Sequence, residues 1–269
     1  MAGPAGRRVT DYYAFIPARA GSKRLPGKNT RVLAGHPLLA YTIAAAQQSG
    51  VFARIIVSTE DARTKAIAEH YGAEVPFYAE TCAAFTHGEV HGDNTPDIAW
   101  VQLLVLALEA DLQAVDAFAI LRPTSPLRSP WTIQDAFQWF AGCDCDSLRE
   151  VAAVREHPGK MWISDPAGWL SPYHPGINIL AGFWVPDHSA PTQTLPEVLV
   201  QTAGLEIAHW HVAYTGNVSI SGPRIVGYRG AGERRVDLNT TDDWEYLEWL
   251  VETGRAALPR VDVQPWRDE

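Results

Sequence analysis

A short loop near the start of the chain gathers side chains suited to binding an anion. The string IPARAGSKRLPGKN, residues 16–29, follows an apolar run and carries Arg19, Lys23, Arg24, Lys28 and Asn29. Backbone N–H groups in a glycine-bearing loop can approach a phosphate closely, and lysine and arginine then neutralise it. The spacing matches neither G-x-x-x-x-G-K-S/T nor G-x-G-x-x-G, which excludes a Walker loop and a dinucleotide fingerprint. On composition alone, an ordinary solvated turn stays open as the alternative.

The basic loop is a local exception on an acidic chain. The 269 residues carry a formal charge of −9, with 46% apolar and 20% charged residues, which is typical of a globular protein and argues against a nucleic-acid partner. The local charge favours a small anionic ligand. No apolar stretch reaches the roughly 18 residues that cross a bilayer, and the start of the chain lacks the apolar centre of a signal peptide. We therefore expect a cytoplasmic protein that does not bind membranes.

Strand and helix patterns alternate over the first 140 residues. Apolar runs predict strands, and helical spacing predicts helices, at 12–16, 38–49, 54–59, 61–71, 73–75, 96–112 and 117–121 in turn. Such alternation predicts an α/β fold, a three-layer Rossmann-like and mostly parallel sheet with helices on both faces. Ligands of these folds bind at the carboxyl ends of the strands, which is where the basic loop lies.

The chain departs from this pattern after Cys145. From 146 to 191, short apolar runs lie among tryptophans, tyrosines and prolines, which predicts a small β-rich excursion. Helical spacing returns at 195–202 and 242–253, and a strand is predicted at 209–214. We therefore expect one α/β domain made of residues 10–145 and 192–255, with 146–191 as a separate segment. The cysteines at 82, 143 and 145 do not match zinc spacing and read as free thiols.

Four stretches together resemble a known family. The loop string IPARAGSKRLPGKN closely resembles the first motif of the CMP-sialic acid synthetase family, the acylneuraminate cytidylyltransferases, which activate acidic sugars with CTP. Three further stretches match in the same order: RIIVSTEDARTKAIAEHYGAEV at 54–75, LRPTSPLR at 121–128 and VDLNTTDDWEYLE at 236–248. The resemblance covers roughly residues 12–140 and 225–250. It implies the nucleotidyltransferase fold and a homodimer built through the 146–191 segment.

The resemblance implies that the opening loop wraps a triphosphate. Nucleotide contacts are then expected from Ala18, Arg19, Gly21, Ser22, Lys23, Lys28 and Asn29. In GDNTPDIAWV, Asp93 and Thr95 are expected near the base or ribose, although Thr95 is equally suited to cap the following helix. Attack on the α-phosphorus builds negative charge on phosphate oxygens, so the resemblance assigns Arg19 and Lys28 to catalysis together with Asp237.

The stretch VDLNTTDDW is similar to the Asp-x-Asp motif with which that family holds magnesium. Asp237 matches the first position, and Asn239 stands at the second. The resemblance therefore implies Mg²⁺ as cofactor, held at Asp237 and Asn239 in a weaker or altered arrangement. Asp242 and Asp243 read instead as first-turn acids of the last helix, where the helix dipole favours them.

Acceptor contacts are expected from RPTSPLR and from the 146–191 segment. The resemblance places Arg122, Thr124 and Ser125 beside the nucleotide and acceptor, and Lys160 and Tyr173 in the acceptor pocket. Many relatives have glutamine where this chain has Arg122, and an arginine there can either bind an anion of the acceptor or form a structural salt bridge. Tyr173 can equally pack against its neighbouring prolines.

Taken together, the motifs imply an enzyme that transfers CMP from CTP to an acidic sugar and releases pyrophosphate. The acceptor would be a nonulosonate or another 2-keto sugar acid. Two alternatives stay open. The altered acceptor segment also suits a different anion such as a phosphonate, and Asn239 in place of aspartate also suits a catalytically inactive nucleotide-binding homologue.

Overall fold

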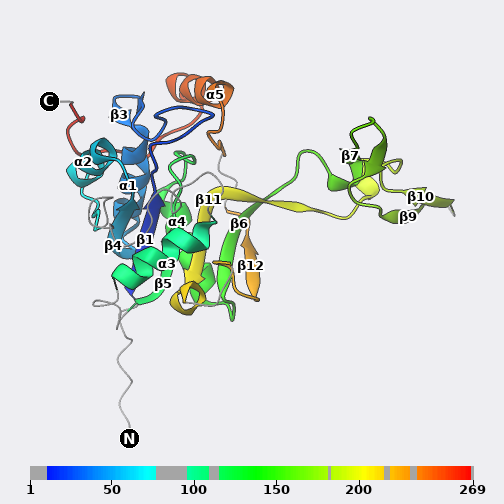
Figure 1. The fold of residues 1–269 in the computed structure, drawn as a ribbon, viewed down its shortest axis with the longest axis horizontal. Coiled ribbons are helices and arrows are strands. Elements are labelled where there is room, and N and C mark those ends of the chain that lie inside the picture. Colours follow the sequence, from blue (N-terminus) through cyan, green and yellow to red (C-terminus); the bar gives the residue numbers. More distant parts are fainter. Residues whose placement is uncertain are drawn as a thin grey trace, which may run out of the picture. The chain divides into compact units, whose positions relative to one another are not determined.

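The structure is a computed structural model, and it forms two compact units. Unit 1 comprises Met1–Glu150 and Thr202–Glu269, and unit 2 comprises Val151–Gln201. The described residues are 11–76, 96–108, 115–180, 183–214, 219–230 and 235–267 (Figure 1). Within these ranges no helix has the length and apolar character needed to cross a membrane.

A six-stranded sheet forms the centre of unit 1, with strand order β12-β6-β11-β5-β1-β4. The strand β1 pairs in parallel with both β4 and β5, and β12 pairs in parallel with β6, whereas β11 runs antiparallel to β5. This mostly parallel sheet confirms the predicted fold class. The strands are β1 Asp11–Pro17, β4 Phe52–Ser58, β5 Val115–Ile120, β6 Ser147–Ala153, β11 Leu199–His209 and β12 Ile225–Tyr228.

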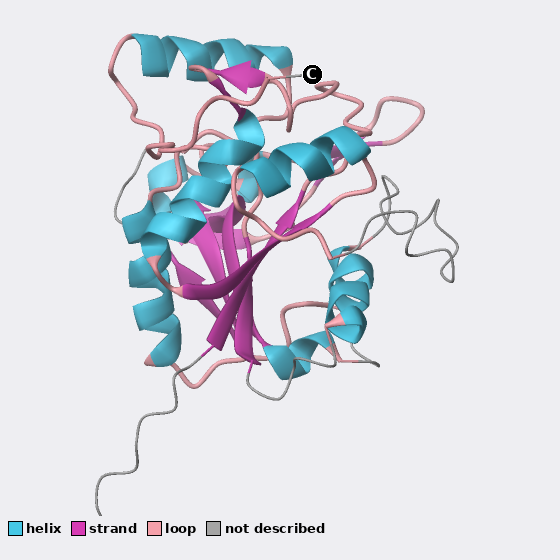
Figure 2. Cartoon of the chain, turned by 90° about the vertical axis from the view of Figure 1, so that its left-hand side faces the viewer, coloured by secondary structure: helices cyan, strands magenta, loops and turns pink. Residues whose placement is uncertain are grey.

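Helices cover both faces of this sheet, and Figure 2 shows them on its two sides. Successive β1 side chains point to opposite faces, so Ile16 packs in one core and Phe15 in the other. The core around Ile16 includes residues of α1 (Leu38–Ser49), α2 (Ala62–His70) and α4 (Pro130–Ala141). The core around Phe15 includes residues of α3 (Asp97–Ala107). Burial on both faces explains why β1 reads as a continuous apolar run.

A third core lies under α5 (Thr241–Glu252). Its fully buried Trp244 packs with Leu38 of α1 and with Leu238, which precedes the helix. A short hairpin of β2 (Val32–Leu33) and β3 (His36–Pro37) leads into α1. The helix α1 ends at Gly50, whose φ of 62° is the left-handed conformation that glycine adopts readily.

The predicted elements of the first half are confirmed except for the strand at 73–75, and the β2–β3 hairpin and one helix were not predicted. The segment at 73–75 makes only one bridge, Ile56 to Glu74, and forms no full strand. The helix α4, which begins with the Ser129 cap and Pro130, has no counterpart in the predicted elements. The helix predicted at 96–112 is observed over Asp97–Ala107, and residues 109–114 lie outside the described part.

Two predictions in the second half are wrong. The helix predicted at 195–202 and the strand predicted at 209–214 are replaced by the single long strand β11 and a 3₁₀ turn at Trp210–Ala213. An eight-residue apolar pattern fits either period, and β11 gains hydrogen-bonded neighbours on both sides in the middle of the sheet. Tertiary pairing therefore overrides the local helical spacing.

Unit 2 is rich in short strands. It contains two hairpins, one of β7 (Trp162–Ser164) with β8 (Leu170–Pro172) and one of β9 (Ile177–Leu180) with β10 (Phe183–Pro186). Three tryptophans of this unit are exposed, with Trp162 at 44%, Trp169 at 77% and Trp184 at 74%. Unit 2 therefore presents exposed aromatic surface.

Candidate active site

The carboxyl ends of three parallel strands meet at one edge of the sheet. The N–H of Ala18, just after β1, donates to the Ser58 carbonyl at the end of β4 over 2.9 Å. The N–H of Leu121, just after β5, donates to the Phe15 carbonyl over 2.9 Å. The loops that follow these strands therefore start side by side, as the doubly wound pattern requires for a ligand site.

The basic loop after β1 is folded back on itself. Buried Asn29 donates from its side-chain amide to the Arg19 carbonyl over 3.0 Å, which ties the two ends of the loop together. The N–H of Ala20 donates to the Glu60 carboxylate over 2.8 Å, and Ala18 is fully buried. Gly21 and Lys23 lie exposed in the turn between Arg19 and Asn29. Asn29 and Ala18 thus shape the loop, and the exposed turn is left facing solvent.

A segment just before α5 joins this loop to the loop after β5. The Lys28 amine donates to the Leu238 carbonyl over 2.9 Å, and the Leu238 N–H donates to the Thr124 carbonyl over 2.9 Å. Burial lowers the pKa of Lys28 below its ordinary value, because desolvation outweighs the attraction of Asp237. Three stretches that lie far apart in the sequence therefore form one local structure.

Asn239 links Asp237 to the basic loop. Its amide nitrogen donates to Asp237 Oδ2 over 2.7 Å, and its oxygen Oδ1 accepts from Arg24 Nη2 over 2.8 Å. Asp243 accepts from the N–H groups of Asn239 and Thr240 and closes a capping box on α5, which confirms it as a first-turn acid. Although burial acts to raise it, these N–H groups hold the pKa of Asp243 below its ordinary value.

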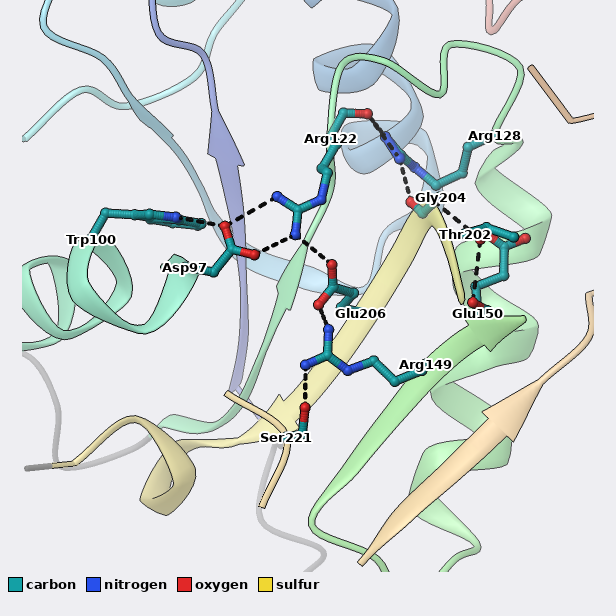
Figure 3. Close-up of polar contacts among 10 residues, drawn as sticks. All are labelled: Asp97, Trp100, Arg122, Arg128, Arg149, Glu150, Thr202, Gly204, Glu206 and Ser221. Carbon is teal, nitrogen blue, oxygen red and sulfur yellow. Dashed lines mark hydrogen bonds and ion pairs between the residues drawn. The ribbon is translucent and has the colours of Figure 1, made fainter. Parts of the chain in front are cut away.

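Arg122, in the loop after β5, lies in a network of charges of which Arg149 and Glu206 are buried and Arg122 and Asp97 are partly exposed (Figure 3). Its guanidinium contacts both oxygens of Asp97, at 2.7 and 3.3 Å, and Glu206 Oε1 at 2.6 Å. Arg149 pairs with the other oxygen of Glu206 and donates to Ser221. Two arginines therefore face two carboxylates, and the structure forms the salt bridge that was one of the two interpretations of Arg122.

This network perturbs the charged groups in it. Burial acts to raise the pKa of Asp97, but the hydrogen bonds and charge of Arg122 lower it by more, so it stays below the ordinary value. Burial and the neighbouring Arg122 lower the pKa of Arg149 to about 10, which keeps it charged at neutral pH. Arg122 thus has its charge balanced inside the chain before any ligand arrives.

Comparison with known proteins finds cytidylyltransferases that are similar to this chain. A family model described as cytidylyltransferase matches residues 13–87. Over 126 residues the chain is 45% identical to CMP-N,N'-diacetyllegionaminic acid synthase of Legionella pneumophila, which covers 46% of this chain and 51% of that protein. It is 28% identical to N-acylneuraminate cytidylyltransferase of Streptococcus agalactiae over 235 residues, 87% of this chain and 51% of that protein. The chain is therefore similar to the CMP-sialic acid synthetase family, as its motifs predict.

A solved structure has a similar fold. A CMP:2-keto-3-deoxy-manno-octonic acid synthetase in complex with CTP superposes with a TM-score of 0.63 at 15% identity, over 91% of this chain and 100% of that chain. At this identity the likeness concerns the fold alone. The chain spans about half the length of the curated relatives that it matches.

The remaining residues that the resemblance singled out lie in unit 2 or outside the described residues. Asp93 and Thr95 lie outside the described residues. Lys160 lies in unit 2, where its amine donates to the carbonyls of His188, over 3.0 Å, and of Ala190. Tyr173 lies in the same unit with 61% of its surface exposed. Within unit 2, Lys160 therefore has a structural role in fixing the turn after β10.

Arg128, the last residue of the family string LRPTSPLR, is a residue that sequence reasoning missed. Its buried guanidinium donates to the carbonyls of Arg122 and Gly204 and to the Thr42 hydroxyl of α1. It fixes the backbone of the turn that carries Thr124 and Ser125. The Thr124 hydroxyl oxygen is buried and has no hydrogen-bond partner among the described residues. The signal in the sequence was an arginine placed after two prolines. Proline has no backbone N–H, so side chains must donate to some of the carbonyls in such a loop.

Proposed function

We propose that this chain transfers CMP from CTP to the hydroxyl of an acidic sugar, a nonulosonate or another 2-keto sugar acid, and releases pyrophosphate. The observation that supports this most is the junction of three stretches, in which Lys28 contacts Leu238 and Leu238 contacts Thr124. The matched proteins are named as a CMP-legionaminic acid synthase and an N-acylneuraminate cytidylyltransferase, which supports the same chemistry.

In the proposed reaction the acceptor hydroxyl attacks the α-phosphorus of CTP. A phosphorus–oxygen bond forms to the acceptor, the bond to the β-phosphate bridging oxygen breaks, and the hydroxyl proton passes to solvent. Negative charge grows on the non-bridging and leaving oxygens, so Arg19 and Lys28 would stabilise the transition state more than bound CTP. Thr124 and Ser125 would face the nucleotide and acceptor from the turn that Arg128 fixes.

Magnesium fits this site through Asp237. The Asp237 side chain is exposed beside the loop, and one of its oxygens accepts from Asn239. The described residues contain no group of three or more histidine, cysteine, aspartate or glutamate side chains arranged to hold a metal. One carboxylate with waters and phosphate oxygens satisfies Mg²⁺. The bound ion would supply positive charge that polarises the α-phosphate.

The same proposal includes a homodimer and a cytoplasmic location. The exposed tryptophans of unit 2, Trp162, Trp169 and Trp184, are large apolar groups of the kind that interfaces bury, and a second copy of the chain would cover them. CTP is a cytoplasmic metabolite, so the reaction belongs in that compartment. We also propose Lys160 and Tyr173 as contacts to the acceptor.

Pyrophosphate release from CTP tests the function. Purified protein is incubated with CTP, Mg²⁺ and a panel of nonulosonates and other 2-keto sugar acids, with phosphonates as a second panel. Release that depends on one sugar acid supports the proposal, and release with phosphonates alone would favour the alternative acceptor. Arg19→Ala and Lys28→Ala should abolish most of the release, whereas Arg260→Ala, an exposed cation of the C-terminal tail, should not. No release with any acceptor would contradict the proposal.

A further inference from the structure

The orientation of the Asn239 amide is fixed by its two partners. A guanidinium only donates hydrogen bonds and a carboxylate only accepts them. Arg24 Nη2 at 2.8 Å therefore faces the amide oxygen, and Asp237 Oδ2 at 2.7 Å faces the amide nitrogen. Reversing the amide would place donor against donor and oxygen against oxygen. Asn239 thus directs N–H groups toward Asp237 and an oxygen toward Arg24.

This orientation limits what Asn239 can offer to a cation. Its oxygen already accepts from an arginine, and its nitrogen cannot bind a metal. Of the two carboxylates Asp237 and Asp243, Asp237 is then the one available to a cation beside the loop. Asp243 instead accepts hydrogen bonds from backbone N–H groups at the start of α5. The donor set suits a single divalent cation with waters and phosphate oxygens rather than two cations.

The local charge points the same way. An amide at position 239 adds no negative charge, and the exposed Arg24 guanidinium is held by it as a fixed positive charge. Arg24 has five N–H donors and uses one of them on Asn239, so its remaining donors have no partner among the described residues. A planar guanidinium with open donors matches two phosphate oxygens well.

We propose that Arg24, oriented by Asn239, takes the place of a second divalent cation, so that the site uses one metal ion and one fixed arginine to neutralise the triphosphate. This inference rests on the proposed function, because it needs a nucleoside triphosphate in the loop. Arg24 binds phosphate oxygens directly, and Asn239 is a positioning residue that holds the guanidinium beside Asp237. The site then remains active with an amide at position 239 in place of the second carboxylate of the Asp-x-Asp motif.

Counting bound metal ions tests this without relying on turnover. Mn²⁺ is titrated into the full chain with saturating α,β-methylene-CTP, an analogue that cannot release pyrophosphate, and free Mn²⁺ is followed by electron paramagnetic resonance. We expect one Mn²⁺ per chain for the wild type. We expect two for the Arg24→Met/Asn239→Asp double variant, which removes the guanidinium and adds a carboxylate at position 239. Two ions bound by the wild type would overturn the inference.

Nucleotide affinity in EDTA supplies the second measurement. Calorimetry should show that Arg24→Met weakens metal-free binding of the analogue by about 10- to 100-fold, the size of a charge-assisted hydrogen bond. Arg260→Met removes one positive charge from the exposed tail and should leave this affinity unchanged. Equal affinity of Arg24→Met and wild type would overturn the inference while leaving the proposed function standing. If no protein binds the analogue with or without Mn²⁺, the proposed function fails and this inference fails with it.

Discussion

The substitution Glu206→Gln gives the sharpest test of the charge network in Figure 3. Glu206 is 4% exposed and contacts two guanidiniums, that of Arg122 at 2.6 Å and that of Arg149. Glutamine keeps the shape of the side chain but removes the charge and one acceptor. Arg149, whose side chain is 11% exposed, then keeps no carboxylate at this contact, whereas Arg122 still has Asp97.

The expected loss follows from how deeply this pair is buried. Removing one partner of a buried ion pair leaves an uncompensated charge and costs about 3–5 kcal/mol. At about 2–4 °C per kcal/mol for a domain of this size, the melting temperature should fall by roughly 6–20 °C. Urea unfolding followed by near-ultraviolet circular dichroism measures the free energy directly.

Two further variants separate burial from charge number. Glu74→Gln breaks the ion pair with Arg54, in which the Glu74 side chain is 47% exposed and the Arg54 side chain 22%. This substitution should lower the free energy of unfolding by no more than about 1 kcal/mol. The double variant Arg149→Met/Glu206→Leu removes both charges and should recover most of the loss, because an apolar pair of similar shape is nearly neutral. If Glu206→Gln and Glu74→Gln cost the same, the argument from burial is refuted.

Three other outcomes are expected. The pKa of Asp97 is lowered in the folded state, so its contribution to stability is present above its unfolded pKa of about 4 and is lost as pH falls through the lower folded value. The difference in unfolding free energy between wild type and Asp97→Asn should therefore disappear in acid, which urea unfolding at a series of pH values would show. Lys28→Met should weaken CTP binding by about 10- to 100-fold in calorimetry, and Lys28→Arg should restore part of it. Thr240→Ala breaks the capping box of α5 and should cost about 1 kcal/mol in urea unfolding, with a chain as stable as wild type counting against the cap.

The sequence was most informative where local pattern and packing agree. The strand β1 is buried on both faces, so its apolar run and the loop after it are readable without knowing the partners of either. The loop position at the carboxyl end of the strand then follows from the α/β alternation. The wrong elements lie where pairing decides: β11 reads as a helix over a few residues and is a strand because β5 and β6 flank it.

The contacts between distant stretches could not be read from the sequence. Nothing in RPTSPLR indicates that Arg128 reaches Gly204 and Thr42, or that Arg122 meets Glu206, because those partners lie on β11 and α1 and depend on the sheet order. The residue types nevertheless gave a usable warning. An arginine after a buried strand needs a partner, and both interpretations of Arg122 named one.

The kind of partner that holds each cation separates the structural arginines from the loop cations. Arg122 and Arg149 are held by carboxylates, which cancel their charge inside the chain. Lys28 is held by the Leu238 carbonyl and Arg24 by the Asn239 amide, and these neutral dipoles orient a cation without cancelling its charge. The pKa of Lys28 is lowered because burial and the neighbouring arginines outweigh the attraction of Asp237. The loop therefore keeps positive charge that an anion can neutralise, and the network behind it does not.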